Sequence, residues 1–368
     1  MADPRVEKLA DILVNYSVSV QPGDDVAILG ALETRPLMVE IYRQVIRAGG
    51  HPLVLWSDSA MQEIFFKEAN EKQLNYVPEA RKLVIEKYDC LISLWGGSNT
   101  RNLANVDPAK LRLNNQAGTE LNKIMMQRSA SGDIRWVGGM YPTPAYAQEA
   151  DMSLSEYEDF VYGACYADKD DPVAEWNRIH DEQQRLVDWL DGKKHVKVKG
   201  PNADVTLSID GRKFINSDGH HNMPSGEIFT SPVDDSTNGW VRFTYPAIYS
   251  GREVEGIELR FENGRIVGAS AKKNEEFLLS VLDTDEGARS LGEFAIGTNT
   301  GIQKFTKSIL FDEKIGGSIH MAVGLAFPEA NGKNESTIHW DMICDMRDGG
   351  KIWVDDELFY DSGEFVAL

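Results

Sequence analysis

The hydrophobic positions in the first half of the chain follow two alternating patterns. Apolar residues recur every three to four positions over residues 6–16 and 34–48, which predicts amphipathic helices. Short continuous apolar runs predict buried strands at residues 26–30, 52–56, 90–95 and 134–139. Strands that alternate with helices in this way favour a parallel sheet covered by helices, which is an α/β domain.

The pattern changes after a helix that begins with the Asp-Pro pair at 171–172. Apolar and polar residues then alternate, for example over residues 205–209, and the Asn-Gly pair at 263–264 predicts a hairpin turn. We expect one helix in this half, over residues 275–289. The chain is also longer than one ordinary core, so we expect two domains. They are an N-terminal α/β domain with a parallel sheet at residues 1–193 and a C-terminal β-rich domain at residues 194–368.

The charge of the chain argues against one class of partner. The 368 residues carry a formal net charge of −20, with 58 acidic against 38 basic residues, and show no basic stripe. A nucleic-acid-binding protein needs such a stripe to neutralise phosphates, so we expect no nucleic-acid partner. The acidic surplus fits solvated surfaces that keep a protein soluble.

Signals for membranes and secretion are missing from the sequence. No apolar run approaches the roughly 18 residues that span a bilayer. The first residues also lack the basic and then apolar order of a signal peptide. The three cysteines, Cys90, Cys165 and Cys344, are far apart in apolar contexts, which indicates free buried thiols. We therefore expect a cytoplasmic protein without membrane contact.

Several common motifs of catalysis are also missing. No G-x-G-x-x-G or Walker A motif follows a predicted strand, so the α/β half has no nucleotide-binding fingerprint. No G-x-S-x-G sequence is present, which argues against a serine hydrolase of the nucleophile-elbow type. The candidate chemistry lies instead in the second half of the chain.

Four segments of that half place polar side chains in or beside apolar runs. Glu227 and Glu293 each follow a glycine and precede an apolar run, and His320 lies within one. His339 and Asp341 are two residues apart, so alternation along a strand puts both side chains on one face. Each feature alone has a plainer interpretation, as a turn carboxylate, a core histidine or a hydrogen-bonded His–Asp pair.

The combination is more informative than its parts. Three carboxylates and two imidazoles without a thiolate suit zinc, cobalt or manganese. A single catalytic zinc typically has three protein ligands and a water, so five side chains are too many for one such ion. They fit two divalent ions that share a bridging carboxylate and a water. The predicted metal ligands are Glu227, Glu293, His320, His339 and Asp341.

These segments resemble the aminopeptidase T family, also called the thermophilic aminopeptidases. The shared features, in order, are Gly-Glu-Ile-Phe-Thr at 226–230, Gly-Glu at 292–293, the strand histidine His320, and His-Trp-Asp at 339–341. The two-part hydrophobic pattern extends the resemblance to nearly the whole chain. The resemblance implies an N-terminal α/β domain, a C-terminal metal-binding domain and a homodimer.

The resemblance also implies an activity. Members of the family are metallo-aminopeptidases that remove N-terminal residues from short peptides. Their equivalent of Glu293 acts as a bridging ligand or general base, which makes Glu293 the expected catalytic residue. In this interpretation, two divalent ions (zinc, cobalt or manganese) activate a water for attack on a peptide that has a free N-terminus.

One position departs from the family pattern. The family usually has a tyrosine seven residues after the strand histidine, and this chain has Phe327 there. A phenylalanine has no hydroxyl with which to donate a hydrogen bond. Strict alternation would place Phe327 on the opposite face from His320, unless Gly324 or Pro328 bends the strand. Other tyrosines could then supply the donor, of which Tyr245 and Tyr249 are the candidates.

Two other functions remain open at this point. Some relatives of this fold resemble mononuclear iron dioxygenases that cleave a hydroxylated pyridine ring, and His320, His339 and Asp341 would supply their facial triad. The presence of both Glu227 and Glu293 argues against that function, because a single iron would not need them. The second is a metal-bearing protein that binds peptides without cleaving them. The number of bound ions and the presence of turnover separate these three functions.

Overall fold

The computed structural model describes residues 3–367, which form two compact units. The first contains the residues up to Glu175 together with Gly219–Pro224, and the second contains Trp176–Asp218 and the residues from Ser225 onward. The domain boundary near residue 193 stays a prediction, because a compact unit need not fold independently. Among the described residues, no helix is both long and apolar enough to cross a membrane.

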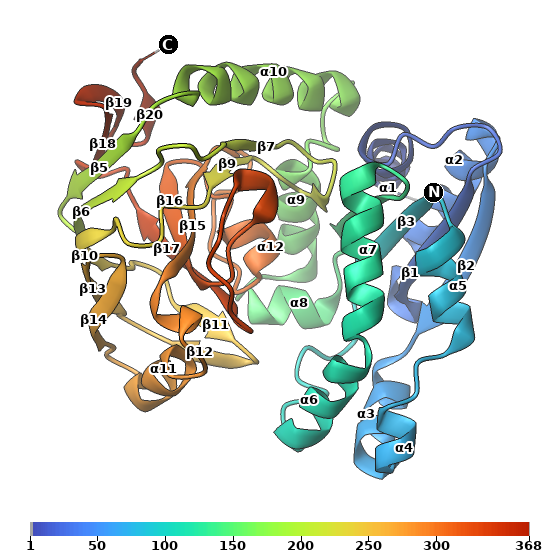
Figure 1. Ribbon diagram of the computed structural model, residues 1–368. Coiled ribbons are helices and arrows are strands. Elements are labelled where there is room, and N and C mark those ends of the chain that lie inside the picture. The colour runs from blue at the N-terminus through green and yellow to red at the C-terminus, as the bar shows by residue number, and fades with distance from the viewer. Residues whose placement is uncertain (1–2, 368) are drawn as a thin grey trace. The chain divides into compact units, whose positions relative to one another are not determined.

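The first unit is built on a parallel sheet, as the hydrophobic pattern predicts (Figure 1). Its central strands are buried on both faces, which explains their continuous apolar runs. Ala27 and Leu91 of these strands pack with Val84 and Ile134 in one hydrophobic cluster. The strand order is β2 (His51–Ser57), β1 (Asp25–Ala31), β3 (Cys90–Trp95), β4 (Arg135–Met140) and β8 (Asn222–Met223).

Helices connect these strands. The first begins with a proline after the N-cap Asp3 and continues as a π-helix over Ile12–Ser17. A longer helix, α10 (Pro172–Leu190), leads into the second unit, and the Asp171 side chain accepts a hydrogen bond from the Ala174 backbone, as expected of a cap. The other helices are α1 (Pro4–Asp11), α2 (Arg35–Ala48), α3 (Ser59–Glu68), α4 (Glu71–Leu74), α5 (Glu79–Lys87), α6 (Pro108–Ala117), α7 (Thr119–Ser131), α8 (Pro144–Glu149) and α9 (Leu154–Ala164).

The second unit is mainly antiparallel, which confirms the predicted β-rich half. The hairpin turn is also confirmed, since Asn263 and Gly264 have positive φ between paired strands. One of its sheets has the order β14 (Arg265–Ser270), β13 (Glu258–Glu262), β10 (Asn238–Arg242), β6 (Ala203–Ser208), β5 (His195–Gly200), β18 (Lys351–Val354), β19 (Glu357–Asp361) and β20 (Glu364–Phe365). A short ribbon pairs β11 (Ala247–Tyr249) with β12 (Arg252–Val254).

The helix predicted over residues 275–289 is shorter than expected. It ends at Leu282 as α11 (Glu275–Leu282), and Gly287–Arg289 forms a separate 3₁₀ turn. Asp285 explains the break, because its side chain accepts hydrogen bonds from the backbone of Ala288 and from Thr337. Aspartate side chains that bond to nearby backbone compete with helix formation. The prediction was wrong at this helix end.

A second antiparallel sheet carries the candidate site. One of its faces packs into the main hydrophobic core of the unit through residues such as Phe294, Met321 and Trp340. In Figure 1, β15, β16 and β17 lie side by side within this unit. The short helix α12 (Ile309–Asp312) lies between β15 and β16 in the sequence. The order of the sheet is β17 (His339–Asp345), β16 (Ser318–Gly324), β15 (Leu291–Gly297), β9 (Glu227–Thr230) and β7 (Ile215–Ser217).

Candidate metal centre

The strand register places the five candidate ligands on one face of this second sheet. Glu293 lies opposite Ala322, which lies opposite Asp341, and residues directly opposite each other in a sheet share a face. His339 is two residues before Asp341, and His320 is two residues before Ala322, so alternation adds both imidazoles to that face. Glu227 joins the same face from β9, opposite Gly297 in the register.

Small residues between the ligands leave room for them. Ala295 and Ala322 lie on the same face as the candidate ligands. Ala295 is opposite His320, and Ala322 is opposite both Glu293 and Asp341. A larger side chain at either position would fill the space toward which the carboxylates and imidazoles point. Both alanines are fully buried. The sequence therefore places polar side chains on a strand face that would otherwise belong to the core.

A β-bulge at Gly292 allows β15 to contribute Glu293. The register shifts between Leu291 and Glu293, so that Leu291 pairs with Val323 and Glu293 pairs with Ala322. Without the bulge, alternation would put Leu291 and Glu293 on the same face. A Cβ at Gly292 would lie 2.1 Å from the Leu325 carbonyl oxygen, which only glycine avoids. The glycine thus sends Leu291 into the core and Glu293 into the site.

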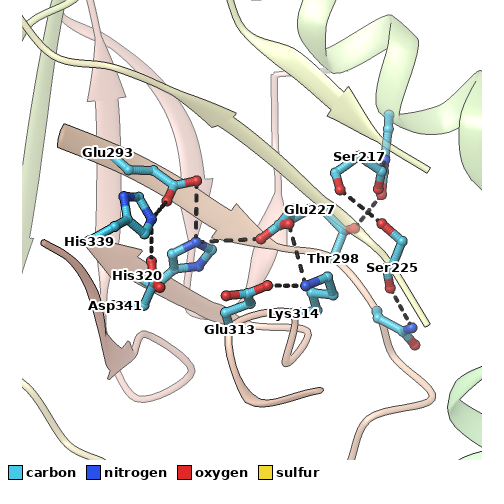
Figure 2. A network of polar contacts seen from close by, with 12 residues as sticks. Ser217, Ser225, Glu227, Glu293, Thr298, Glu313, Lys314, His320, His339 and Asp341 are labelled. Atoms are coloured by element: carbon cyan, nitrogen blue, oxygen red, sulfur yellow. Dashed lines mark hydrogen bonds and ion pairs between the residues drawn. The ribbon is translucent and has the colours of Figure 1, made fainter. Parts of the chain in front are cut away.

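The side chains converge closely (Figure 2). Nε2 of His339 lies 3.3 Å from Oε2 of Glu293 and 3.4 Å from Oδ1 of Asp341. Nε2 of His320 lies 3.6 Å from Oε1 of Glu293 and 3.4 Å from Oε2 of Glu227. Glu293 therefore faces both imidazoles, and the five residues form one continuous cluster.

Two further charged residues belong to this cluster. Lys314 is fully buried, and its Nζ lies 3.6 Å from Oε1 of Glu227 and in contact with the Glu313 carboxylate. Neither residue was predicted from the sequence, because a Glu-Lys pair in a loop usually indicates a solvated turn. Their only signal is position, since they come shortly before the strand that carries His320.

Several buried polar atoms of the cluster lack hydrogen bonds. Within residues 3–367, Oε2 of Glu227, Nδ1 of His320 and Oδ1 of Asp341 are buried and make no hydrogen bond of normal geometry. Buried polar atoms normally have a partner, because leaving one without a partner costs about 1–3 kcal/mol. Nδ1 of His339 is satisfied, since it donates to the Leu325 carbonyl oxygen at 2.9 Å. That bond directs Nε2 of His339 toward the carboxylates.

The carboxylates change the acidity of both imidazoles. Burial alone lowers the pKa of His320, but Glu293 and Glu227 outweigh burial and raise the pKa to about 10. Burial likewise opposes charge on His339, yet Asp341 and Glu293 raise its pKa to about 12. Without a bound cation, protons on the two histidines therefore neutralise part of the carboxylate charge.

The carboxyl groups respond in opposite directions. Burial raises the pKa of Asp341, but His339 and His320 outweigh it and hold that pKa well below its usual range. Burial raises the pKa of Glu313 to about 7, even though Lys314 opposes the shift. The buried carboxylates therefore need positive charge nearby, from protonated histidines, from Lys314 or from a bound cation.

This arrangement fits divalent cations. Ligand atoms of Glu293, His339 and Asp341 all lie within 4.8 Å of one another, and the same holds for Glu313, His320 and Asp341. The two groups share Asp341, as neighbouring metal positions with a common carboxylate would. Oxygen and imidazole donors without sulfur suit zinc, cobalt or manganese. A cation bound between these side chains would give the buried oxygens of Glu227 and Asp341 the partner that they lack.

Phe327 lies at the His339 end of the cluster. Its ring centroid is 5.0 Å from the His339 ring in an edge-to-face arrangement, and 5.0 Å from Phe229. The chain reaches this position because β16 ends at Gly324, which has φ of +98°. A Cβ at Gly324 would lie 2.2 Å from the Ile338 carbonyl oxygen, so only glycine permits the bend. The bend overrides the alternation that would have pointed Phe327 away from the site.

In the described chain, neither of the two alternative tyrosines donates a hydrogen bond to the cluster. The Tyr245 hydroxyl donates to Asp345 at 3.4 Å and accepts from Arg347 at 2.9 Å. Tyr249 packs against Trp340, whose ring lies on the opposite face of β17 from His339. Within the part of the chain that the structure describes, neither hydroxyl bonds to a cluster residue.

Known proteins resemble this chain over nearly its whole length. The family described as thermophilic metalloprotease (M29) matches residues 2–365. Aminopeptidase 2 of Geobacillus stearothermophilus is 29% identical over 94% of this chain and 93% of its own length. Aminopeptidase T of Thermus thermophilus is 26% identical over 92% of this chain and 91% of its own length.

A solved structure, wild-type AmpT from Thermus thermophilus, shares the fold. It matches with a TM-score of 0.87 and covers 99% of both chains at 23% sequence identity. The α/β half and the β-rich half that the sequence predicts therefore occur together in a known structure.

Proposed function

Because this chain belongs to the thermophilic metalloprotease family, it is a metal-dependent hydrolase, and we propose that it is an aminopeptidase that uses two metal ions. The resemblance of the chain to the aminopeptidase T family is confirmed. The proposed reaction removes the N-terminal residue from short peptides. The observation that carries the proposal is the convergence of five ligand side chains on one strand face, with buried polar atoms that lack hydrogen bonds.

The proposed ligands divide into two overlapping groups. Glu293, His339 and Asp341 form one, and His320 and Glu227 extend the cluster toward Glu313. Divalent ions held by these residues would supply Lewis acidity, which would polarise a scissile carbonyl and lower the pKa of a water. Zinc, cobalt and manganese all suit these donors. The overlap supports two ions, because no single ion position would use all five side chains.

Glu293 is the proposed general base. Its carboxylate lies between the two imidazoles, with one oxygen facing His320 and the other facing His339. From this position it can accept a proton as water oxygen bonds to the peptide carbonyl carbon, and can return it to the nitrogen as the C–N bond breaks. The products are a free amino acid and a peptide shortened by one residue.

A peptide panel tests this function. We expect purified, metal-loaded protein to release the first residue from short peptides, as detected by mass spectrometry. The matched control is the same panel with acetylated N-termini, which should remain intact. Cleavage of acetylated peptides at internal bonds would indicate an endopeptidase. Binding of peptides without cleavage would instead favour a metal-bearing binding protein.

Assembly and location form part of the proposal. We expect a homodimer on the basis of family resemblance, and a cytoplasmic location because the three buried cysteines form no disulfide. The peptide is the expected partner.

Metal binding is expected to release protons. Both histidine pKa values are raised, so at neutral pH the metal-free protein holds protons that a ligating imidazole must lose. The raised values favour the folded, metal-free protein fully below a pH of about 6.5, and this contribution is lost as the pH rises through about 10. Metal affinity should therefore increase with pH, about tenfold per pH unit for each proton released.

Calorimetry in two buffers of different ionisation enthalpy measures this release directly. At pH 8, above the pKa of about 7 that burial gives Glu313, we expect about two protons per chain, one from each of the two histidines. A binding enthalpy that does not depend on the buffer would contradict the assignment of both histidines.

The Phe327→Tyr variant is expected to increase turnover. The ring already lies against His339, so a hydroxyl would be added beside the cluster. A hydrogen-bond donor that stabilises a developing oxyanion typically contributes roughly 10²–10³ in turnover. We expect a gain of that order with little change in KM, measured by steady-state kinetics on a cleaved peptide. Phe305→Tyr, which adds a hydroxyl to a ring stacked on Tyr245, is the matched control and should change neither constant.

A further inference from the structure

Lys314 is the one lysine side chain that the structure describes as fully buried among the carboxylates of the cluster. Its side chain is 0% exposed, and its two carboxylate partners, Glu227 and Glu313, are 7% and 15% exposed. Burying an ammonium group costs several kcal/mol unless it is paired and hydrogen-bonded, so this position is unfavourable without those two partners. A fully buried lysine between two carboxylates is rare, so its burial calls for a structural or functional explanation.

The backbone around Lys314 is held firmly in place. The Asn299 amide donates to the Lys314 carbonyl oxygen at 3.1 Å, and the Lys314 amide donates to Phe311 at 3.0 Å. Farther back in the loop, the backbone and hydroxyl of Thr306 donate to the buried Asp312 carboxylate at 2.7 and 2.9 Å. The loop after β15 therefore brings the lysine to the cluster in a defined orientation.

The loop also passes close to the strand that lies next to Glu227. Gly297 lies opposite Glu227 in the register, and a Cβ there would lie 2.3 Å from the Ile315 carbonyl oxygen. The close approach requires glycine and brings Lys314 beneath the Glu227 carboxylate. Figure 2 shows the resulting row of side chains, in which Lys314 lies between Glu313 and Glu227, and Glu227 reaches on to His320.

Direct chemistry by this lysine does not fit its surroundings. A nucleophilic or Schiff-base lysine must be accessible and must lose its proton readily. Lys314 is sealed from solvent, and although burial lowers its pKa, Glu227 and Glu313 outweigh burial and raise that pKa above its usual range. It is therefore a fixed positive charge that substrate cannot reach.

We propose that Lys314 is a positioning residue, whose ammonium group holds Glu227 and Glu313 together as the carboxylates of the second metal position, beside His320. The proposal rests on the two-metal function proposed above. Without the ammonium, the two carboxylates would repel each other and turn apart. The group of Glu313, His320 and Asp341 would then lose its geometry. The group of Glu293, His339 and Asp341 would keep its own contacts.

Substitution with methionine tests the proposal, because it keeps much of the side-chain volume and removes the charge. Direct metal analysis and titration should find two ions per chain in the wild type. We expect Lys314→Met to bind the second ion about 10–100-fold more weakly, the loss typical of residues that support metal ligands. The cobalt-loaded variant should also show a changed visible spectrum, because cobalt absorption reports the number and geometry of the ligands.

Lys314→Ala provides a second test through rescue. This variant leaves a cavity, so added propylammonium should restore the second ion. Lys314→Met fills the cavity and should not respond, which separates a positioning charge from general loss of packing. Lys351→Met is the matched control, because it breaks a partly exposed ion pair with Asp361 in another sheet and should bind both ions normally. If Lys314→Met fails to fold, the rescue of Lys314→Ala decides.

The outcomes separate this inference from the proposed function. A wild type that binds fewer than two ions would contradict the proposed function. A wild type with two ions, together with a Lys314→Met variant that binds both as tightly and with an unchanged cobalt spectrum, would overturn the positioning role alone. Tighter binding of the second ion by Lys314→Met would overturn it as well, because the lysine would then act only by repelling cations.

Discussion

The Glu293→Gln variant is expected to hydrolyse peptides about 10²–10⁴-fold more slowly than the wild type, the range that loss of a general base typically gives. Glutamine keeps the shape of the side chain and removes its ability to accept a proton. It also removes the negative charge that faces Nε2 of both His320 and His339. Turnover on an aminoacyl substrate, measured at saturating metal, gives the result.

Glu262→Gln is the matched control for this variant. Glu262 lies in the exposed hairpin end of β13, so the same substitution there should leave turnover unchanged. Circular dichroism should show both variants folded, since glutamine at position 293 fits the same space. Wild-type turnover in Glu293→Gln would mean that another residue is the base.

The second large effect is expected from removal of a direct ligand. His339→Ala should lose most of its bound metal on dialysis, and Glu227→Gln should do the same at the other end of the cluster. The loss should exceed the roughly 10–100-fold decrease in affinity that follows mutation of outer partners of metal ligands. Elemental analysis of dialysed protein measures it.

His195→Ala is the control for the histidine variant, because His195 is exposed on β5, which belongs to a different sheet from the strands of the cluster. It should retain metal like the wild type. Two ions per chain at wild-type affinity in both His339→Ala and Glu227→Gln would remove the basis for the assigned site.

The sequence predicted those parts of the site that follow from local alternation. His339 and Asp341 were expected on one strand face, and their side chains lie 3.4 Å apart in β17. His320 was expected in an apolar strand and lies in β16, which is buried along its length. Period-two alternation is a local property, so it can be read from a few residues.

Features that depend on an irregular backbone could not be predicted from period-two alternation. The bulge at Gly292 exchanges the faces of Leu291 and Glu293, and the positive φ at Gly324 turns Phe327 toward His339. Each irregularity arises because a carbonyl oxygen from another segment approaches a glycine too closely for any Cβ. Such approaches are tertiary contacts, so the glycines alone do not predict them.

Glu313 and Lys314 illustrate a different limit. They lie in a loop, where charged residues are usually solvated, and no periodic pattern marks them as buried. Only the folding of the loop over Gly297 brings them to the cluster. A charged pair can indicate a buried site when it precedes an apolar strand that carries a candidate ligand, as the strand with His320 does here.

The number of metal ions that full activity requires tests the central claim most directly. Metal-free protein is titrated with zinc, cobalt or manganese while aminopeptidase turnover and bound metal are both measured. The structure predicts that activity reaches its maximum at two ions per chain, because two overlapping groups of ligands share Asp341. Full peptide hydrolysis with a single ion, or a single tightly bound iron with oxygen-dependent cleavage of a hydroxylated pyridine ring, would contradict it.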